Sequence, residues 1–203
     1  MSAQLVFPTY IYTGNLGAAG KKLNRDLAPE IATLSEIDKA GGQCSKSNYT
    51  GGYSSYASMT RLNRTSPNFG ELEKRLQPHV KKFVAKLKWD LLGRKLAMTT
   101  CWANSMGFAT HHTLHSHPLS VLSGVYYVTV PKGSSGLKIE DPRMGFLMNS
   151  PPRRASAPAK EQNYLLIKPK PGDFILFESW VRHEVPPHRV KQPRLSISFN
   201  YEF

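Results

Sequence analysis

Residues 111–130, HHTLHSHPLSVLSGVYYVTV, indicate the fold class of this chain most strongly. A histidine-rich run passes there into a long segment of Val, Leu and Tyr, residue types that favour β-strands. Similar short runs lie on either side of it: KLAMTTCWAN before it, and GLKIE, NYLLIK, DFILF and RLSISFNYEF after it. Gly, Pro, Ser and Asp separate these runs, so residues 96–203 are predicted to form an antiparallel β-sandwich or barrel.

The N-terminal part, residues 1–95, carries helical patterns. Between residues 22 and 38, apolar residues recur at intervals of four, four and three, at Leu23, Leu27, Ile31 and Leu34. This spacing places them on one face of a helix, which Pro29 would kink or restart. Ser66 followed by Pro67 is typical of the start of a second helix. We expect these helices to pack on the outside of the barrel.

The segment between the two predicted helices, residues 41–59, has the sequence GGQCSKSNYTGGYSSYASM. Its many Gly and Ser residues indicate that it forms no regular element. No boundary divides the chain, so we predict a single domain, 1–203, of the α+β class. Its helical part, 1–95, would pack on a β-rich core, 96–203.

Composition excludes several classes of protein. The chain has 203 residues, of which 40% are hydrophobic, and only two cysteines, Cys44 and Cys101. Such a chain can bury a core without disulfides or a structural metal. No apolar run approaches the roughly 20 residues that cross a bilayer, and no secretory signal begins the sequence. We therefore expect a cytoplasmic, reduced protein in which any metal is functional.

The net charge of +13 comes from 27 Lys and Arg residues against 14 Asp and Glu residues. A nucleic acid, an anionic surface or an acidic substrate could account for this charge. The basic residues, however, are scattered over most of the chain, so we interpret them as a solvated basic surface. Binding of nucleic acid stays open but is not favoured.

Seven histidines supply the candidate metal ligands. His115 and His117 lie two residues apart at the edge of a predicted strand, where alternate side chains point the same way. His183 follows the predicted strand DFILF and is the natural third ligand. Imidazole binds Zn, Fe, Cu and Ni alike, so the spacing predicts a divalent metal without naming it. A chance pair or a hydrogen-bonded structural pair would explain the first two histidines equally well.

The other histidines are weaker candidates. His111 lies an even number of residues from His117 but would need an unbroken strand to share its face, and we expect residues 110–113, which include His112, to belong to a turn. We expect His79, in the helical part, and His188, which follows two prolines, to lie at the surface.

A candidate anion-binding residue opens the last predicted strand. Alternation along RLSISFN puts Arg194, Ser196 and Ser198 on one face and Leu195, Ile197 and Phe199 on the other. If the polar face is turned inward, a buried guanidinium requires a carboxylate partner, which a small dicarboxylate cofactor would supply. An ordinary strand with its polar face in water would show the same alternation.

These motifs together resemble a known family. HSHPLSVLSGVYYV, LKIEDPR, KPGDFILFESWVRHEVPPH and RLSISFN, with the WAN element at 102–104, are similar in order and spacing to 2-oxoglutarate- and iron(II)-dependent oxygenases of bacteria and phages. The resemblance covers residues 97–203. It implies a double-stranded β-helix, which is a jelly-roll, cupin-like barrel, and a hydroxylase that couples oxidative decarboxylation of 2-oxoglutarate to oxidation of a substrate.

By position, the resemblance implies that His115, His117 and His183 bind iron(II). It further implies that Arg194 and Ser196 bind the distal carboxylate of 2-oxoglutarate. Asn104 and Tyr126 are implied as further cosubstrate contacts. The chain departs from the usual triad of two histidines and one carboxylate, because His117 stands where an acidic residue is usual. Three neutral imidazoles also describe zinc sites and some thiol dioxygenases.

Two other functions stay open on the sequence. One is a cupin-like metal dioxygenase that uses the three histidines without 2-oxoglutarate, with Arg194 holding the substrate itself. The other is a non-enzymatic basic binding module. The sequence leaves three classes of substrate open: a protein residue, a small metabolite or a nucleobase. It is also compatible with a homodimer. Residues 149–162, NSPPRRASAPAKEQ, are expected to form a surface loop, and a lid is the functional alternative.

Overall fold

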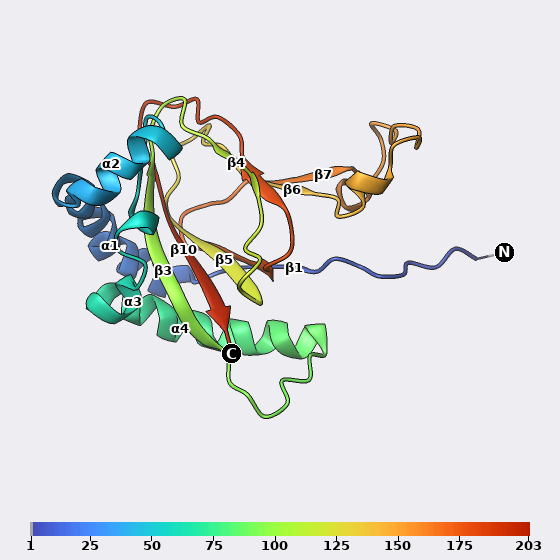
Figure 1. The fold of residues 1–203 in the computed structure, drawn as a ribbon, viewed down its shortest axis with the longest axis horizontal. Coiled ribbons are helices and arrows are strands. Elements are labelled where there is room, and N and C mark those ends of the chain that lie inside the picture. The colour runs from blue at the N-terminus through green and yellow to red at the C-terminus, as the bar shows by residue number, and fades with distance from the viewer. Residues whose placement is uncertain (1) are drawn as a thin grey trace.

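The computed structural model describes residues 2–203 and contains two antiparallel β-sheets with helices on one side (Figure 1). The strands are β1 (Ile11–Asn15), β2 (Tyr53–Ser54), β3 (Ala97–Met106), β4 (His112–His115), β5 (Leu122–Thr129), β6 (Leu137–Glu140), β7 (Tyr164–Ile167), β8 (Asp173–Glu178), β9 (His183–Val185) and β10 (Arg194–Glu202). The helices are α1 (Gly17–Ile37), α2 (Lys39–Asn48), α3 (Leu62–Thr65) and α4 (Pro67–Leu87). Short 3-10 helices are η1 (Ser55–Ala57), η2 (Met144–Phe146) and η3 (Ala159–Glu161).

The larger sheet has the strand order β1-β8-β5-β10-β3-β2, and the smaller sheet has the order β4-β9-β6-β7. From β3 onward, strands that follow one another along the chain alternate between the two sheets, except for the neighbouring pair β6 and β7 in the smaller sheet. The sheets thus form the two walls of a jelly-roll. This arrangement confirms the predicted β-rich core with flanking helices.

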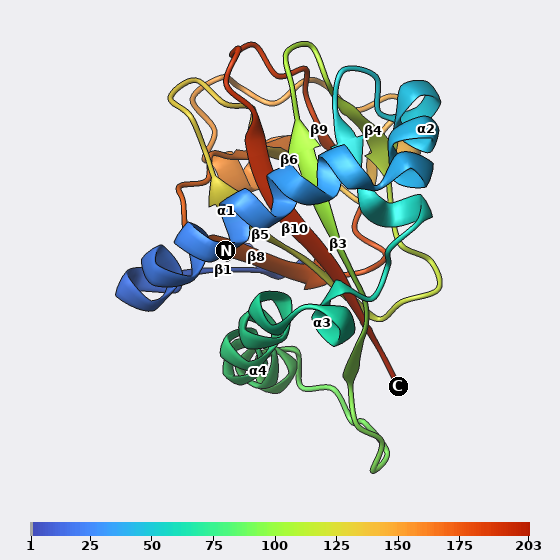
Figure 2. The ribbon, with the colours of Figure 1, turned by 90° about the vertical axis from the view of Figure 1, so that its left-hand side faces the viewer.

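The outer face of the larger sheet packs against the helices. Figure 2 shows α1 lying across this face, with α4 running below it. Leu27 and Ile31 of α1 and Leu72 and Phe83 of α4 are buried in one apolar cluster with Phe199 of β10. The apolar periodicity in the sequence therefore corresponds to a buried face on each of the two long helices, α1 and α4.

Helix α4 begins as the sequence predicts. The Ser66 side chain accepts a hydrogen bond from the backbone N–H of Phe69, and Pro67 occupies the first turn, where its missing N–H costs nothing. Pro78 and, in α1, Pro29 lie inside the helices. The helix ends at Lys88, whose backbone is left-handed with φ 54°.

The segment 41–59 is more ordered than its composition indicates. Helix α2 occupies residues 39–48 because the Asp38 carboxylate caps it, accepting from the N–H of Gly41 at 2.9 Å and from the Tyr53 hydroxyl at 2.8 Å. A Cβ atom at Gly41 would collide with that carboxylate, so glycine permits the cap. The prediction of no regular element here is wrong because this tertiary contact outweighs local propensity.

The N-terminal part is also not only helical. Strand β1 pairs with β8, and β2 pairs with β3, so residues 1–95 supply both edge strands of the larger sheet.

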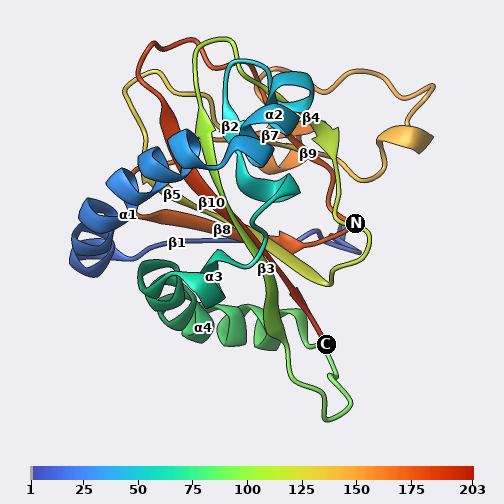
Figure 3. The same cartoon turned by 60° about the vertical axis from the view of Figure 1, so that its left-hand side comes forward.

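No helix in residues 2–203 is long and apolar enough to cross a membrane. Figure 3 shows that α2 and β2 lie near β4, at one end of the barrel, and residues of all three line one pocket.

Candidate metal and cosubstrate site

The structure brings His115, His117 and His183 together. One nitrogen atom from each ring lies within 4.8 Å of the other two, the spacing of three ligands around one ion. The register explains the convergence, because His115 of β4 lies directly opposite His183 of β9. His117 follows β4 and is held by its backbone N–H, which donates to the carbonyl of Ser179 at 2.9 Å.

Backbone contacts fix which nitrogen of two of these rings faces the shared space. Nδ1 of His115 lies 2.7 Å from the carbonyl oxygen of Thr113, and Nδ1 of His183 lies 3.0 Å from that of Val181. A carbonyl oxygen only accepts, so Nδ1 of each ring carries the proton. The unprotonated Nε2 is then free to bind a metal, which is the usual arrangement of a metal-binding histidine.

Burial keeps these imidazoles neutral. Desolvation, with a smaller contribution from His115, lowers the pKa of His183 to about 3 and that of His117 to about 4. Burial also lowers the pKa of His115. Only the neutral form has a lone pair for a metal, so the three rings could hold one ion at neutral pH.

No carboxylate joins the cluster among residues 2–203. Glu184, next to His183, turns to the other face of β9 and forms an ion pair with Lys138 at 2.7 Å. Glu140 of the neighbouring strand pairs with Arg182, also at 2.7 Å. The structure therefore agrees with the departure from the usual triad. Three neutral imidazoles face the site, and the two nearby glutamates form ion pairs with Lys138 and Arg182 instead.

Arg194 lies inside the barrel. Its side chain is 2% exposed, and its Nε and Nη1 atoms have no hydrogen-bond partner among the described residues. Its guanidinium lies 5.3 Å from the ring centre of Tyr127, in the interior between the two sheets. A buried charge without a partner is expensive, so these atoms are suited to an incoming carboxylate.

The other residues predicted to contact the cosubstrate divide between the two faces of the sheet. Ser196 is 2% exposed and lies opposite Asn104, whose side-chain amide donates to Ser198 at 3.1 Å. These side chains line the interior with Arg194. Tyr126 instead points toward the helices, where its hydroxyl donates to Asn24 of α1 at 2.7 Å. The structure therefore does not bring Tyr126 to the histidines.

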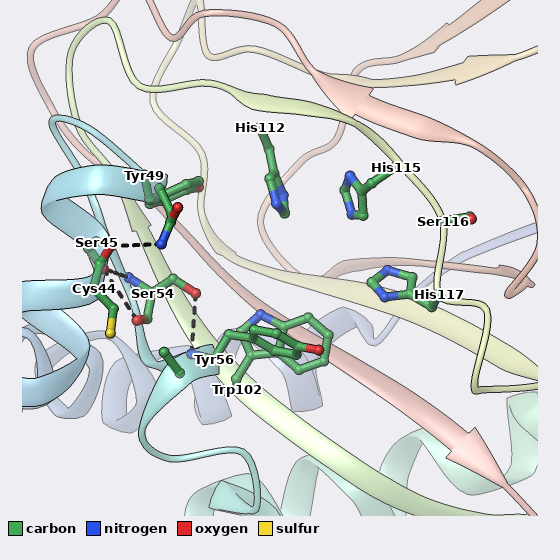
Figure 4. Close-up of a pocket in the computed structure, with 12 residues that line it drawn as sticks. Cys44, Ser45, Tyr49, Ser54, Tyr56, Trp102, His112, His115, Ser116 and His117 are labelled. Atoms are coloured by element: carbon green, nitrogen blue, oxygen red, sulfur yellow. Dashed lines mark hydrogen bonds between the residues drawn. The ribbon is translucent and has the colours of Figure 1, made fainter.

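A cavity of about 230 Å³ opens in front of the histidines (Figure 4). Its walls come from β4, from Trp102 of β3 and from the N-terminal part, which contributes Tyr49 and Tyr56. Sequence reasoning missed these two tyrosines, since they lie in a segment without a regular pattern. It also placed His112 among the weaker candidates, although the His112 ring lies 4.1 Å from that of His115.

His188 and the segment 149–162 are the two remaining parts of the chain for which the sequence provides an expectation. His188 is fully buried, with Nε2 3.0 Å from the carbonyl of Gln192, so its prediction as a surface residue is wrong. Residues 149–162 project from the β6–β7 end of the smaller sheet, away from α2 (Figure 1). None of them lines the cavity. A role for them as a lid stays a prediction.

Residues 100–200 match the family described as "Putative 2OG-Fe(II) oxygenase". The chain belongs to this family. Membership confirms the class of enzyme and the cofactors predicted from the sequence, an oxidoreductase that uses iron(II) and 2-oxoglutarate. No protein of curated function matches the chain by sequence.

Solved structures share the fold. A prolyl-4-hydroxylase from Pseudomonas putida aligns over 96% of this chain and 92% of its own, with a TM-score of 0.61 and 14% identity. HygX from Streptomyces hygroscopicus, solved with nickel and 2-oxoglutarate, aligns over 96% and 83%, with a TM-score of 0.64 and 12% identity. A 2OG-Fe(II) oxygenase family protein from Burkholderia pseudomallei aligns over 54% of this chain and 46% of its own, with a TM-score of 0.39 and 17% identity. The first two support the double-stranded β-helix.

Proposed function

We propose that His115, His117 and His183 bind iron(II), the first and the last through Nε2, and that Arg194 and Ser196 bind the distal carboxylate of 2-oxoglutarate. The observation that carries this proposal is the buried guanidinium of Arg194, which has unpaired donors in the same interior as three convergent neutral imidazoles. A dicarboxylate whose other end reaches the histidines would satisfy both.

The residues of this chain position the reactants. Arg194 offers paired N–H donors of fixed geometry, which match a carboxylate better than a lysine would. Trp102, whose ring centre lies 6.0 Å from that of His117, and the surrounding apolar residues limit the access of water. When bound, iron(II) supplies the activation of dioxygen that couples decarboxylation of 2-oxoglutarate to substrate oxidation.

The substrate group that enters the cavity is, in this proposal, uncharged. The twelve residues that line the cavity include no Asp, Glu, Lys or Arg, and the aromatic rings of Tyr56 and Trp102 form one wall. A charged substrate group would lose its hydration there without gaining an oppositely charged partner among these residues. A small metabolite, a nucleobase and a neutral side chain of a protein all meet this requirement.

The test begins with metal binding. Wild-type protein should bind Mn(II) or Co(II) in a 1:1 ratio by isothermal titration, and His183→Ala should lose at least about a hundredfold in affinity, since loss of a ligand exceeds the cost of losing a supporting contact. The matched control is His111→Ala, because His111 is exposed and outside the cluster. Equal metal affinity in His183→Ala would contradict the ligand assignment.

Turnover is tested without knowledge of the substrate. Under anaerobic conditions, iron(II) and 2-oxoglutarate should together produce a visible charge-transfer band, and admission of oxygen should release succinate. A protein that binds iron but shows neither result would instead be the three-histidine dioxygenase that does not use 2-oxoglutarate. That second candidate is favoured only by His117 at the position where an acidic residue is usual.

The remaining expectations concern location and partners. We propose a cytoplasmic protein on the basis of its two free thiols, Cys44 and Cys101. A homodimer and a contact with nucleic acid through the basic surface stay predictions. Light scattering tests the first, and salt-dependent binding of an oligonucleotide tests the second.

A further inference from the structure

His112 lies in the cavity wall with no assigned role. Its ring stands between two others, 4.1 Å from the ring centre of His115 and 5.7 Å from that of Tyr49, edge-on to the latter. Figure 4 shows the ring projecting into the cavity beside His115. Neither of its ring nitrogens has a hydrogen-bond partner among residues 2–203.

An irregularity in β4 brings His112 to this position. His115 pairs with His183, whereas His112 pairs with Val185, so three steps along β4 match two steps along β9. This extra residue is a β-bulge, which lets residues three apart share one face. His112 and His115 therefore both face the cavity, while the preceding residue, His111, is exposed.

His112 and Tyr49 also lie near Arg194. The positive charge of Arg194 acts on both side chains. Hence His112 lies beside the metal-ligand candidate His115 and is close enough to the anion-binding candidate Arg194 to be affected by its charge. A 2-oxoglutarate molecule that contacts both His115 and Arg194 would therefore come close to the His112 ring.

We propose that His112 is a binding residue for 2-oxoglutarate, to which one of its ring nitrogens donates a hydrogen bond. This inference rests on the proposed function of the site. A neutral imidazole always carries one N–H donor, and a dicarboxylate offers only acceptors. Because the donor of His112 has no partner within the described part of the protein, the ligand is its natural acceptor.

Two variants separate hydrogen bonding from packing. His112→Phe keeps a ring against His115 and Tyr49 but removes the donor, whereas His112→Gln keeps a donor without the ring. The matched control is His111→Phe, which makes the same substitution on the exposed neighbour. Each protein is loaded with Mn(II), and its affinity for 2-oxoglutarate is measured by isothermal titration, which does not depend on turnover.

His112→Phe should weaken 2-oxoglutarate binding by roughly 10- to 100-fold, the range expected for a hydrogen bond to a charged group. Its Mn(II) affinity should stay within about twofold of wild type. His112→Gln should recover most of the loss, and His111→Phe should match wild type.

Unchanged 2-oxoglutarate affinity in His112→Phe would overturn the inference. A parallel loss of Mn(II) affinity would also overturn it, since His112 would then act by orienting His115. If His112→Phe does not fold, His112→Ala replaces it under the same criteria. Wild-type protein that binds Mn(II) but no 2-oxoglutarate would instead refute the proposed function itself.

Discussion

The two faces of strand β10 show how this protein separates stability from chemistry. The outward face presents Leu195, Ile197 and Phe199 to the helices, within one large apolar cluster. The inward face presents Arg194 and Ser196 to the space between the sheets, together with Ser198. Both faces are buried, yet only the inner one holds a charged side chain, Arg194, with donors left unpaired among residues 2–203.

This difference teaches that burial alone does not tell core from site. Burial of an apolar face stabilises the folded protein. Burial of a guanidinium costs the folded protein interactions with water, which only a bound ligand replaces. The outer face should therefore control folding, and the inner face should control binding. Substitutions on each face test this separation.

The largest effect is expected on the outer face. Phe199→Ala should lower the free energy of unfolding by about 3–5 kcal/mol, because Phe199 is fully buried and its removal leaves a cavity. Urea denaturation measures the loss. At a temperature where the variant is folded, its affinity for Mn(II) should equal that of wild type. A substantial loss of metal affinity in folded protein would show that the two faces are coupled.

Unlike Phe199→Ala, Arg194→Met should impair ligand binding and leave stability unchanged or improved. It should weaken 2-oxoglutarate binding about 10- to 100-fold, since charge-assisted hydrogen bonds are lost. The same variant, without ligand, should be as stable as wild type or about 1 kcal/mol more stable, because methionine fills similar volume without a buried charge. Thermal unfolding without ligand checks the second outcome, and a strongly destabilised variant would contradict our interpretation of the inner face.

Gly124→Ala tests how closely the outer face is packed. An added Cβ would lie 2.5 Å from Cε2 of Phe199 and 2.8 Å from the backbone oxygen of Ile175. The backbone contact cannot relax by a rotamer change, so we expect a loss of about 1–3 kcal/mol in the free energy of unfolding. In the Phe199→Ala background the loss should be smaller, and a full double-mutant cycle measures that coupling.

The smallest effect is pH-dependent. Burial raises the pKa of Asp38, but hydrogen bonds from Ser58, Gly41 and Tyr53 outweigh it and hold that pKa below its usual value. Its contribution to stability is therefore complete above the unfolded pKa near 4 and is lost as the pH falls through the lower folded value. Wild type should exceed Asp38→Asn by about 1 kcal/mol at pH 7. An advantage that persists unchanged at pH 2 would contradict this assignment.

Much of the fold could be predicted from local patterns. The start of α4 follows from Ser66 and Pro67, and the alternation in RLSISFN correctly separates the two faces of β10. Helix α2 could not be predicted, because its cap depends on Tyr53 and Ser58, which reach Asp38 only in the folded chain. Tyr126 could not be placed either, since alternation does not say which face of a strand meets the helices.

The sequence by itself determined the strand-rich C-terminal part, the spacing of His115 and His117, and the family, because periodicity and motif order are local properties of the chain. Only the tertiary structure decided that His183 lies opposite His115, that Arg194 is buried with Nε and Nη1 unpaired among the described residues, and that His112 lines the cavity beside His115. Strand register, a β-bulge and the approach of α2 fix these positions. They depend on contacts between residues far apart in the sequence, which no local pattern records.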